Sequence, residues 1–128
     1  MSLPEGTLTF VFTDIEGSTR QWDLHPQQMD PALQLHDAVL TEIIQKHAGH
    51  VIKGMGDGIL AVFTDPGNGI AAALEVQTTF PELPWPNNTP LLVRVALHTG
   101  VAQKRNDDYF GPTLNRTARL LSIGWQSW

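Results

Sequence analysis

Hydrophobic residues along the chain form several short patterns that are typical of strands. Residues 8–13 (LTFVFT) are apolar on both faces, which predicts a central strand covered on both sides. Two further apolar runs, 51–53 and 59–63, flank the glycine-rich segment 54–58, and this arrangement predicts a hairpin. Residues 91–98 alternate in the manner of a strand.

Two other segments have the period of a helix. Apolar residues recur every three or four positions over residues 31–47, and Asp30 and Pro31 predict the start of this helix, with Asp30 as the N-cap. A second Asp-Pro pair, at 65–66, predicts a helix that ends near residue 80. The four prolines of the following segment, PELPWPNNTP, predict an irregular loop.

The last third of the chain adds a hairpin and a helix. Thr99 and Gly100 predict a turn into a second hairpin arm at 101–104, with a polar tip at 105–108, and a final helix is expected from Pro112. The resulting order is β-α-β-β-α-β-(β)-α. This order predicts an α/β (α+β) sandwich with a ferredoxin-like βαββαβ core, a mixed antiparallel sheet and helices on one face.

Composition narrows the class of protein. The chain has 128 residues, of which 41% are hydrophobic, and this suits a single domain with a real core. A net charge of −5 argues against a general nucleic-acid partner, and the absence of cysteine excludes disulfides and thiolate metal sites. No apolar run approaches the length of a membrane span, and no secretory signal is visible, so we expect a cytoplasmic protein without a membrane partner.

Two acids stand where they could carry chemistry. Asp14 ends the apolar strand, and Asp57 lies at the tip of the glycine-rich hairpin. If the hairpin lies beside the strand, both carboxylates could bind Mg²⁺, and the helix start at Gly17, Ser18 and Thr19 could present backbone N–H groups to phosphates. The alternative is that Asp14 caps a helix and Asp57 forms a turn. Spacing alone favours this alternative, because aspartate is common at both places.

Three further polar residues are candidates with equally ordinary alternatives. Lys53 could pair with a phosphate or a base, or it could be an edge-strand lysine that prevents aggregation. Asn115 and Arg119 are four positions apart and share one face of the expected last helix, where they could orient a ribose and stabilise charge on a phosphoryl group. They could also be part of a solvated polar face.

Three ordered blocks carry a resemblance to a known family. They are FVFTDIEGST at 10–19, IKGMGDGILAVF at 52–63, and VRVALHTG at 93–100 continuing to DYFGPTLNRTARLL at 108–121. Together they resemble the catalytic domain of class III adenylate and guanylate cyclases, and the bacterial cyclase-homology domains in particular. Ser18 departs from the pattern, since an aromatic residue is frequent in the family at this position.

The resemblance implies roles for individual residues. Asp14 and Asp57 match the two metal-binding aspartates, which implies two Mg²⁺ or Mn²⁺ ions per site, and Ile15 matches the residue whose carbonyl joins them. Lys53 and Asp108 match the purine-reading positions. A Lys/Asp pair resembles adenylate rather than guanylate cyclases, because lysine can donate to adenine N1 and aspartate can accept from the N6 amino group. In the last block, the ribose-orienting and transition-state residues are matched by Asn115 and Arg119.

The implied function is the conversion of ATP to cyclic AMP and pyrophosphate. The family's active sites lie between two catalytic domains, so the resemblance also implies a homodimer with two shared sites. After Leu121 the sequence departs from the family, and we therefore expect a single cyclase domain over 1–128 that lacks the C-terminal strands and helix. The alternative is a catalytically incomplete domain that binds nucleotide or a regulatory partner without turnover. A nucleotidyl transferase with a different product is a third interpretation.

Overall fold

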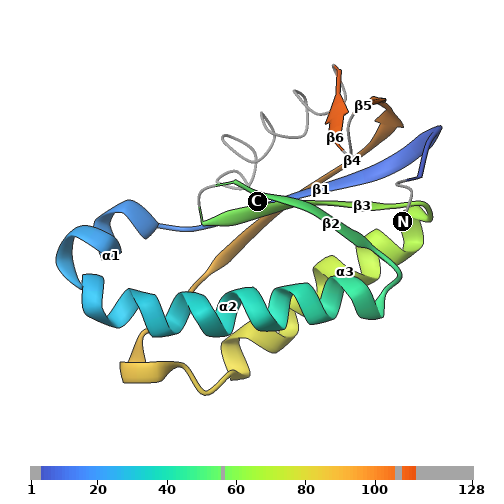
Figure 1. Cartoon of the computed structure of the whole chain (residues 1–128). Coiled ribbons are helices and arrows are strands. Elements are labelled where there is room, and N and C mark those ends of the chain that lie inside the picture. Colours follow the sequence, from blue (N-terminus) through green and yellow to red (C-terminus); the bar gives the residue numbers. More distant parts are fainter. Residues whose placement is uncertain (1–3, 56, 106–107, 112–128) are drawn as a thin grey trace.

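The centre of the molecule is a four-stranded antiparallel sheet (Figure 1). The computed structural model describes residues 4–55, 57–105 and 108–111. The strands follow one another across the sheet in the order β2-β3-β1-β4, in which every neighbouring pair is antiparallel. Their bounds are β1 Thr7–Ile15, β2 His50–Met55, β3 Gly58–Phe63 and β4 Val93–Val101.

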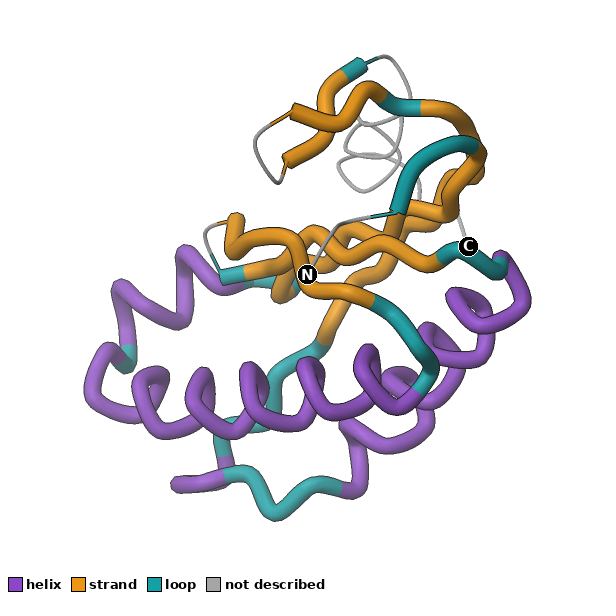
Figure 2. The backbone as a smooth tube through the Cα atoms, turned by 45° about the vertical axis from the view of Figure 1, so that its right-hand side comes forward, coloured by secondary structure: helices purple, strands orange, loops and turns teal. Residues whose placement is uncertain are grey.

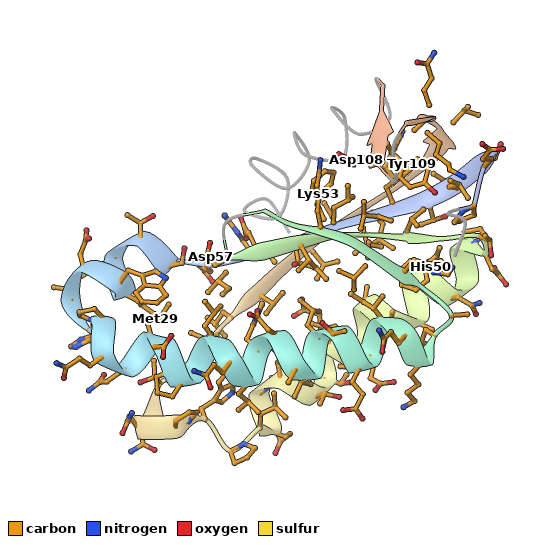
Figure 3. All side chains as sticks on the ribbon, in the orientation of Figure 1. Met29, His50, Lys53, Asp57, Asp108 and Tyr109 are labelled. Atoms are coloured by element: carbon orange, nitrogen blue, oxygen red, sulfur yellow. The ribbon has the colours of Figure 1, made fainter. Side chains whose placement is uncertain are left out.

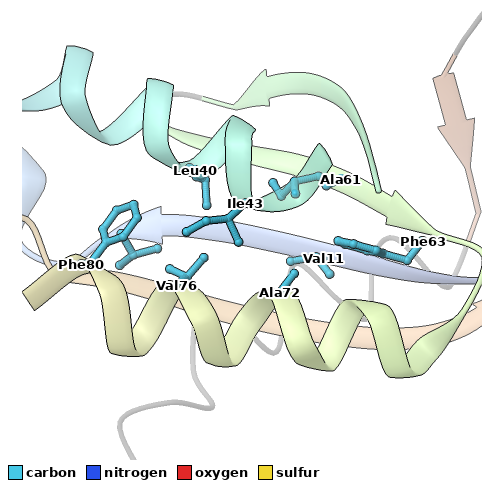
Figure 4. Packing of buried hydrophobic residues seen from close by; sticks show 10 residues of the cluster. Val11, Leu40, Ile43, Ala61, Phe63, Ala72, Val76 and Phe80 are labelled. Atoms are coloured by element: carbon cyan, nitrogen blue, oxygen red, sulfur yellow. The ribbon is translucent and has the colours of Figure 1, made fainter. Parts of the chain in front are cut away.

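Two helices cover one face of this sheet, α2 (Pro26–Lys46) and α3 (Pro66–Thr79). Asp65 caps α3, because its carboxylate accepts a hydrogen bond of 2.8 Å from the backbone N–H of Gly67. Side chains of both helices interlock with the sheet in a buried core (Figure 4). This core comprises Val11, Leu40, Ile43, Ile44, Ala61, Phe63, Ala72, Val76, Phe80 and Val93.

A small hairpin lies over the face of the sheet opposite to α2 and α3 (Figure 2). It consists of β5 (Gln103–Arg105) and β6 (Asp108–Phe110). A second buried cluster forms beneath it, from Leu8, Phe10, Phe12, Leu60, Val62, Ala96 and Tyr109. The strand β1 therefore has apolar neighbours on both faces, as its sequence predicts.

The architecture confirms the predicted fold class. The strand order and the βαββαβ connectivity are those of a ferredoxin-like core, with both long helices on one face. No helix in the described part of the chain combines the length and the apolar character that crossing a membrane requires. The final helix expected from Pro112 lies outside the described residues.

The predicted start of the first long helix is wrong. The helix α2 begins at Pro26 rather than after Asp30, and Pro31 lies inside it. The extra turn brings Met29 into a buried cluster with Ile15 and Leu91, which offsets the single backbone hydrogen bond that Pro31 cannot donate. The spacing of Met29 to the later apolar positions of the helix already follows the helical period.

Two predicted turns are also wrong. The strand β4 continues through Thr99 and Gly100, because β1 is long enough to pair with it as far as Val101, and the hydroxyls of Thr9 and Thr99 form a cross-strand hydrogen bond of 2.8 Å. The turn of the first hairpin is shorter than 54–58, since β2 extends to Met55 and pairs there with Gly58.

Short helical segments stand in the connections that follow β1 and α3. Helix α1 (Ser18–Leu24) has Gly17 at its N-cap in a left-handed conformation (φ 67°) and shows no side-chain cap, so Ser18 and Thr19 lie within the first turn instead of capping it. The proline-rich loop contains two 3-10 turns, η1 (Phe80–Glu82) and η2 (Pro86–Asn88), where an irregular loop was expected.

Candidate active site

The turn between β2 and β3 lies directly against the end of β1. A Cβ atom on Gly58 would stand 1.7 Å from the carbonyl oxygen of Thr13, so only glycine permits this approach. The backbone N–H of Ile59 donates to the Thr13 hydroxyl at 3.1 Å and ties the two segments together. Because Asp57 precedes Gly58 and Asp14 follows Thr13, the fold brings the two predicted metal-binding segments side by side.

A hollow of about 300 Å³ opens next to Asp57. Ser18 and Thr19 of α1 line it together with the half-buried Trp22 and Leu33. Figure 3 shows Asp57 beside α1, at the end of the sheet where this short helix lies. The structure thus places two of the three predicted phosphate-contacting residues, Ser18 and Thr19, and one of the predicted metal ligands around the same space.

Arg94 is a site residue that the sequence reasoning missed. It is the cross-strand partner of Asp14 in the β1–β4 pairing. Its Nε donates to Oδ1 of Asp14 at 2.5 Å, its Nη2 donates to Oδ2, and this bidentate contact raises the pKa of Arg94 above its usual value. The signal was present in the sequence, since Arg94 is the one charged residue in the apolar stretch LLVRVAL.

The predicted purine-reading residues, 55 positions apart in sequence, form an ion pair. Lys53 Nζ donates to Oδ2 of Asp108 at 2.8 Å (Figure 3). A bulge in β2 makes this contact possible: Val51 pairs with Ala61, but Lys53 already pairs with Leu60. The extra residue, Ile52, packs with the cluster beneath the β5–β6 hairpin, and Lys53 also faces that hairpin instead of the helices.

The Lys53 ammonium lowers the pKa of Asp108, an effect that partial burial opposes and the Tyr109 backbone N–H supports. We expect Lys53→Gln to raise the pKa of Asp108 towards its usual range, as followed by NMR titration of the carboxyl carbon. Lys46→Gln, which removes a partner of Glu75 instead, should leave the pKa of Asp108 unchanged. An unchanged pKa in Lys53→Gln would contradict the pairing.

The sign of the pH effect follows from the lowered pKa. A depressed carboxyl pKa stabilises the fold above the unfolded value, near pH 4, and this stabilisation is lost as the pH falls through the lower folded value. The difference in unfolding free energy between the wild type and Lys53→Gln should therefore shrink below about pH 4. Both side chains are partly exposed, so this difference is small.

Residues 2–127 match the family described as the adenylate and guanylate cyclase catalytic domain. The chain belongs to this cyclase family. An uncharacterised protein of Mycobacterium tuberculosis is 39% identical over 122 residues, which are 94% of this chain and 40% of that protein. The chain therefore spans about two fifths of the length of this relative.

Proteins named as adenylate cyclases are similar at lower identity. The adenylate cyclase of Schizosaccharomyces pombe is 28% identical over an alignment 148 residues long, gaps included. This alignment covers 96% of this chain and 9% of that enzyme. A solved structure of a Trypanosoma brucei adenylate cyclase, described in its monomeric state, superposes with a TM-score of 0.87 and 27% identity, over 96% of this chain and 71% of that chain. These matches agree with the ferredoxin-like core seen here.

The cyclase domain supplies few protein ligands for a metal in its described part. Within residues 4–55, 57–105 and 108–111, no group of three or more histidine, cysteine, aspartate or glutamate side chains is arranged as a metal site. The carboxylates of Asp14 and Asp57 are oxygen donors of the kind that a hard cation takes beside water and phosphate oxygens, and both oxygens of Asp14 accept from Arg94 in the structure. The predicted ribose and transition-state residues, Asn115 and Arg119, lie outside the described residues.

Proposed function

We propose that this domain converts ATP to cyclic AMP and pyrophosphate, in intracellular signalling, as a homodimer with shared active sites. The observation that carries the proposal is the Lys53–Asp108 pair, in which a cationic donor and an anionic acceptor meet at 2.8 Å on the face opposite the helices. Both side chains are partly exposed, so a base can reach them. Membership of the cyclase family supports the reaction type.

The pair matches the edge of adenine better than that of guanine. Adenine offers an acceptor at N1 and a donor at its N6 amino group, which suit Lys53 and Asp108 respectively. Guanine reverses both positions, because N1 carries a hydrogen and O6 is an acceptor. The ion pair must open to admit the base, and each partner then exchanges one hydrogen bond for another. This chemistry supports ATP as the substrate.

The metal-binding half of the site would be formed by the end of β1 and the turn before β3. Asp14, the carbonyl of Ile15 and Asp57 would hold two Mg²⁺ or Mn²⁺ ions. When bound, the ions would polarise the phosphates and favour ionisation of the ribose 3′-hydroxyl. Gly17, Ser18 and Thr19 would contact the phosphates. Arg94 neutralises Asp14 in the structure, and its guanidinium would become available to a phosphate oxygen once a cation takes its place.

The positions of the two halves favour a site shared between two copies. Lys53 and Asp108 face each other across the β5–β6 side of the sheet, whereas Asp57 lies beside α1 (Figure 3). A two-fold dimer would bring the base-reading pair of one copy to the metal-binding segments of the other, and it would create two equivalent sites. Asn115 and Arg119 would then act on the ribose and on the charge of the transition state.

An assay of the full chain tests the proposal. We expect purified protein with Mn²⁺ or Mg²⁺ to form cyclic AMP from ATP faster than cyclic GMP from GTP, with a rate that rises more than linearly with protein concentration because the sites need two chains. If nucleotide stabilises the protein against heat but no product forms at any protein concentration, the proposed enzymatic function is overturned and a binding module is favoured. A rate strictly proportional to protein at all concentrations would overturn the shared site.

A further inference from the structure

The residue that follows Asp108 is a buried tyrosine anchored at two points. Tyr109 is 1% exposed, although it belongs to a short hairpin outside the main sheet. Its ring meets Phe10 of β1 edge to face, with centroids 5.1 Å apart, and its hydroxyl donates to the backbone carbonyl of Pro4 at 2.5 Å. Burial raises the pKa of Tyr109, so the hydroxyl keeps its proton and remains a donor.

Asp108 depends on this neighbour for its orientation. One oxygen of its carboxylate accepts from the backbone N–H of Tyr109 at 2.8 Å, and the other accepts from Lys53 at 2.8 Å. The hairpin has only three paired residues on each strand, and a two-stranded ribbon of this size is marginal by itself. The hairpin therefore takes its position from the side chain that it buries in the sheet.

We propose that Tyr109 is a positioning residue that sets the choice of base, because it fixes Asp108 opposite Lys53. The proposal rests on the proposed base-reading function of that pair. It states that the selectivity of the pair depends on Tyr109, a residue that touches neither the base nor the phosphates. The segment before β1 takes part through the Pro4 carbonyl. Glu5 of the same segment lies 3.9 Å from Lys104 of β5, a second contact between this segment and the hairpin.

The physical reason is that selectivity needs a fixed acceptor. When the ion pair opens for the base, the Tyr109 backbone N–H still holds one oxygen of the Asp108 carboxylate. A carboxylate held in this way leaves a mismatched base with unpaired polar groups, which costs binding energy. A carboxylate on a loose hairpin can turn or withdraw, so the mismatch is relieved and the two bases are bound more equally. Loss of Tyr109 should therefore lower the preference for ATP over GTP more than it lowers turnover.

Two substitutions separate the ring from the hydroxyl. Tyr109→Leu removes both anchors, and we expect the ratio of kcat/KM for ATP to that for GTP to fall about tenfold or more. The pKa of Asp108, followed by NMR, should rise towards its usual range because Lys53 and the Tyr109 N–H are no longer held against it. Tyr109→Phe keeps the ring on Phe10, and both quantities should move in the same direction by less.

A buried aromatic on the other face provides the matched control. Phe80 is 3% exposed and packs in the helix-side core. Phe80→Leu should lower the melting temperature as Tyr109→Leu does, while the nucleotide ratio and the pKa of Asp108 stay as in the wild type. A shift of equal size in this control would show that general loosening, rather than Tyr109, moves the ratio, and it would overturn the proposal.

Two measurements, the ratio of kcat/KM for the two nucleotides and the pKa of Asp108, distinguish failure of this proposal from failure of the proposed function. A wild-type chain that neither binds nor converts either nucleotide would overturn the cyclase function, and the pKa of Asp108 would then decide the role of Tyr109 alone. An unchanged Asp108 pKa in both Tyr109 variants overturns the positioning role. If Tyr109→Leu does not fold, Tyr109→Phe decides, and an unchanged nucleotide ratio and pKa in this variant overturn the hydroxyl anchor and with it the proposal.

Discussion

Asp57→Asn is expected to reduce cyclic AMP formation by at least about a hundredfold, while the protein stays folded. Substitutions of groups that only support metal ligands already cost ~10–100-fold, so loss of a ligand carboxylate should cost no less. Asp57 precedes the glycine that lies against the end of β1, and an amide cannot supply the negative charge of its carboxylate. The initial rate at saturating Mn²⁺ and ATP measures the effect.

A nearby aspartate, Asp37, provides a control with the same change of side chain. Asp37 of α2 lines a neighbouring hollow of about 240 Å³ that also touches Asp57. Asp37→Asn therefore removes the same charge from the same region. Its rate should stay within about twofold of the wild type, because Asp37 is exposed and an amide oxygen at this position can still bond to the His36 ring. Equal losses in both variants would show that local charge, and not ligation by Asp57, governs activity. Full activity of Asp57→Asn would refute the metal assignment.

Among glycine-to-alanine substitutions in the described part of the chain, Gly58→Ala should lower the stability of the fold most. The added methyl would stand 1.7 Å from the Thr13 carbonyl oxygen, which is backbone and cannot turn away. The hairpin must therefore move off the end of β1. Overpacking of this kind costs about 1–3 kcal/mol, and it would also separate Asp57 from Asp14. We expect a melting temperature lower by several degrees, together with loss of activity.

Gly54 is the matched control in the same hairpin. A Cβ atom at Gly54 meets nothing within 4 Å, and its φ lies outside the left-handed region. Gly54→Ala should leave the melting temperature unchanged or raise it slightly, since alanine restricts the unfolded chain. Thermal unfolding of both variants, monitored by circular dichroism, makes the comparison. Equal stability of Gly58→Ala and the wild type would mean that the turn does not lie against β1 as described.

Much of this fold follows from local signals in the sequence. The doubly apolar β1, the β2–β3 hairpin and the Asp-Pro start of α3 each express a local rule of periodicity or capping, and each is present in the structure. The run of β4 through Thr99 could not be read locally, and at the start of α2 the Asp-Pro signal competes with the helical period that already includes Met29. In both cases burial or pairing over a longer distance outweighs a proline or glycine signal that would end an isolated element.

The features of the candidate active site also fall into those that the sequence determines and those that only the tertiary structure decides. The sequence alone determines which residue types are present and, through ordered motifs, the cyclase family to which they belong. Only the tertiary structure decides that Arg94 pairs with Asp14, since that contact joins residues 80 positions apart across two strands. The bulge that turns Lys53 towards Asp108 is likewise a property of pairing, because strict alternation would point Lys53 at the helices. Local propensity acts over a few residues, whereas register and burial depend on the whole sheet.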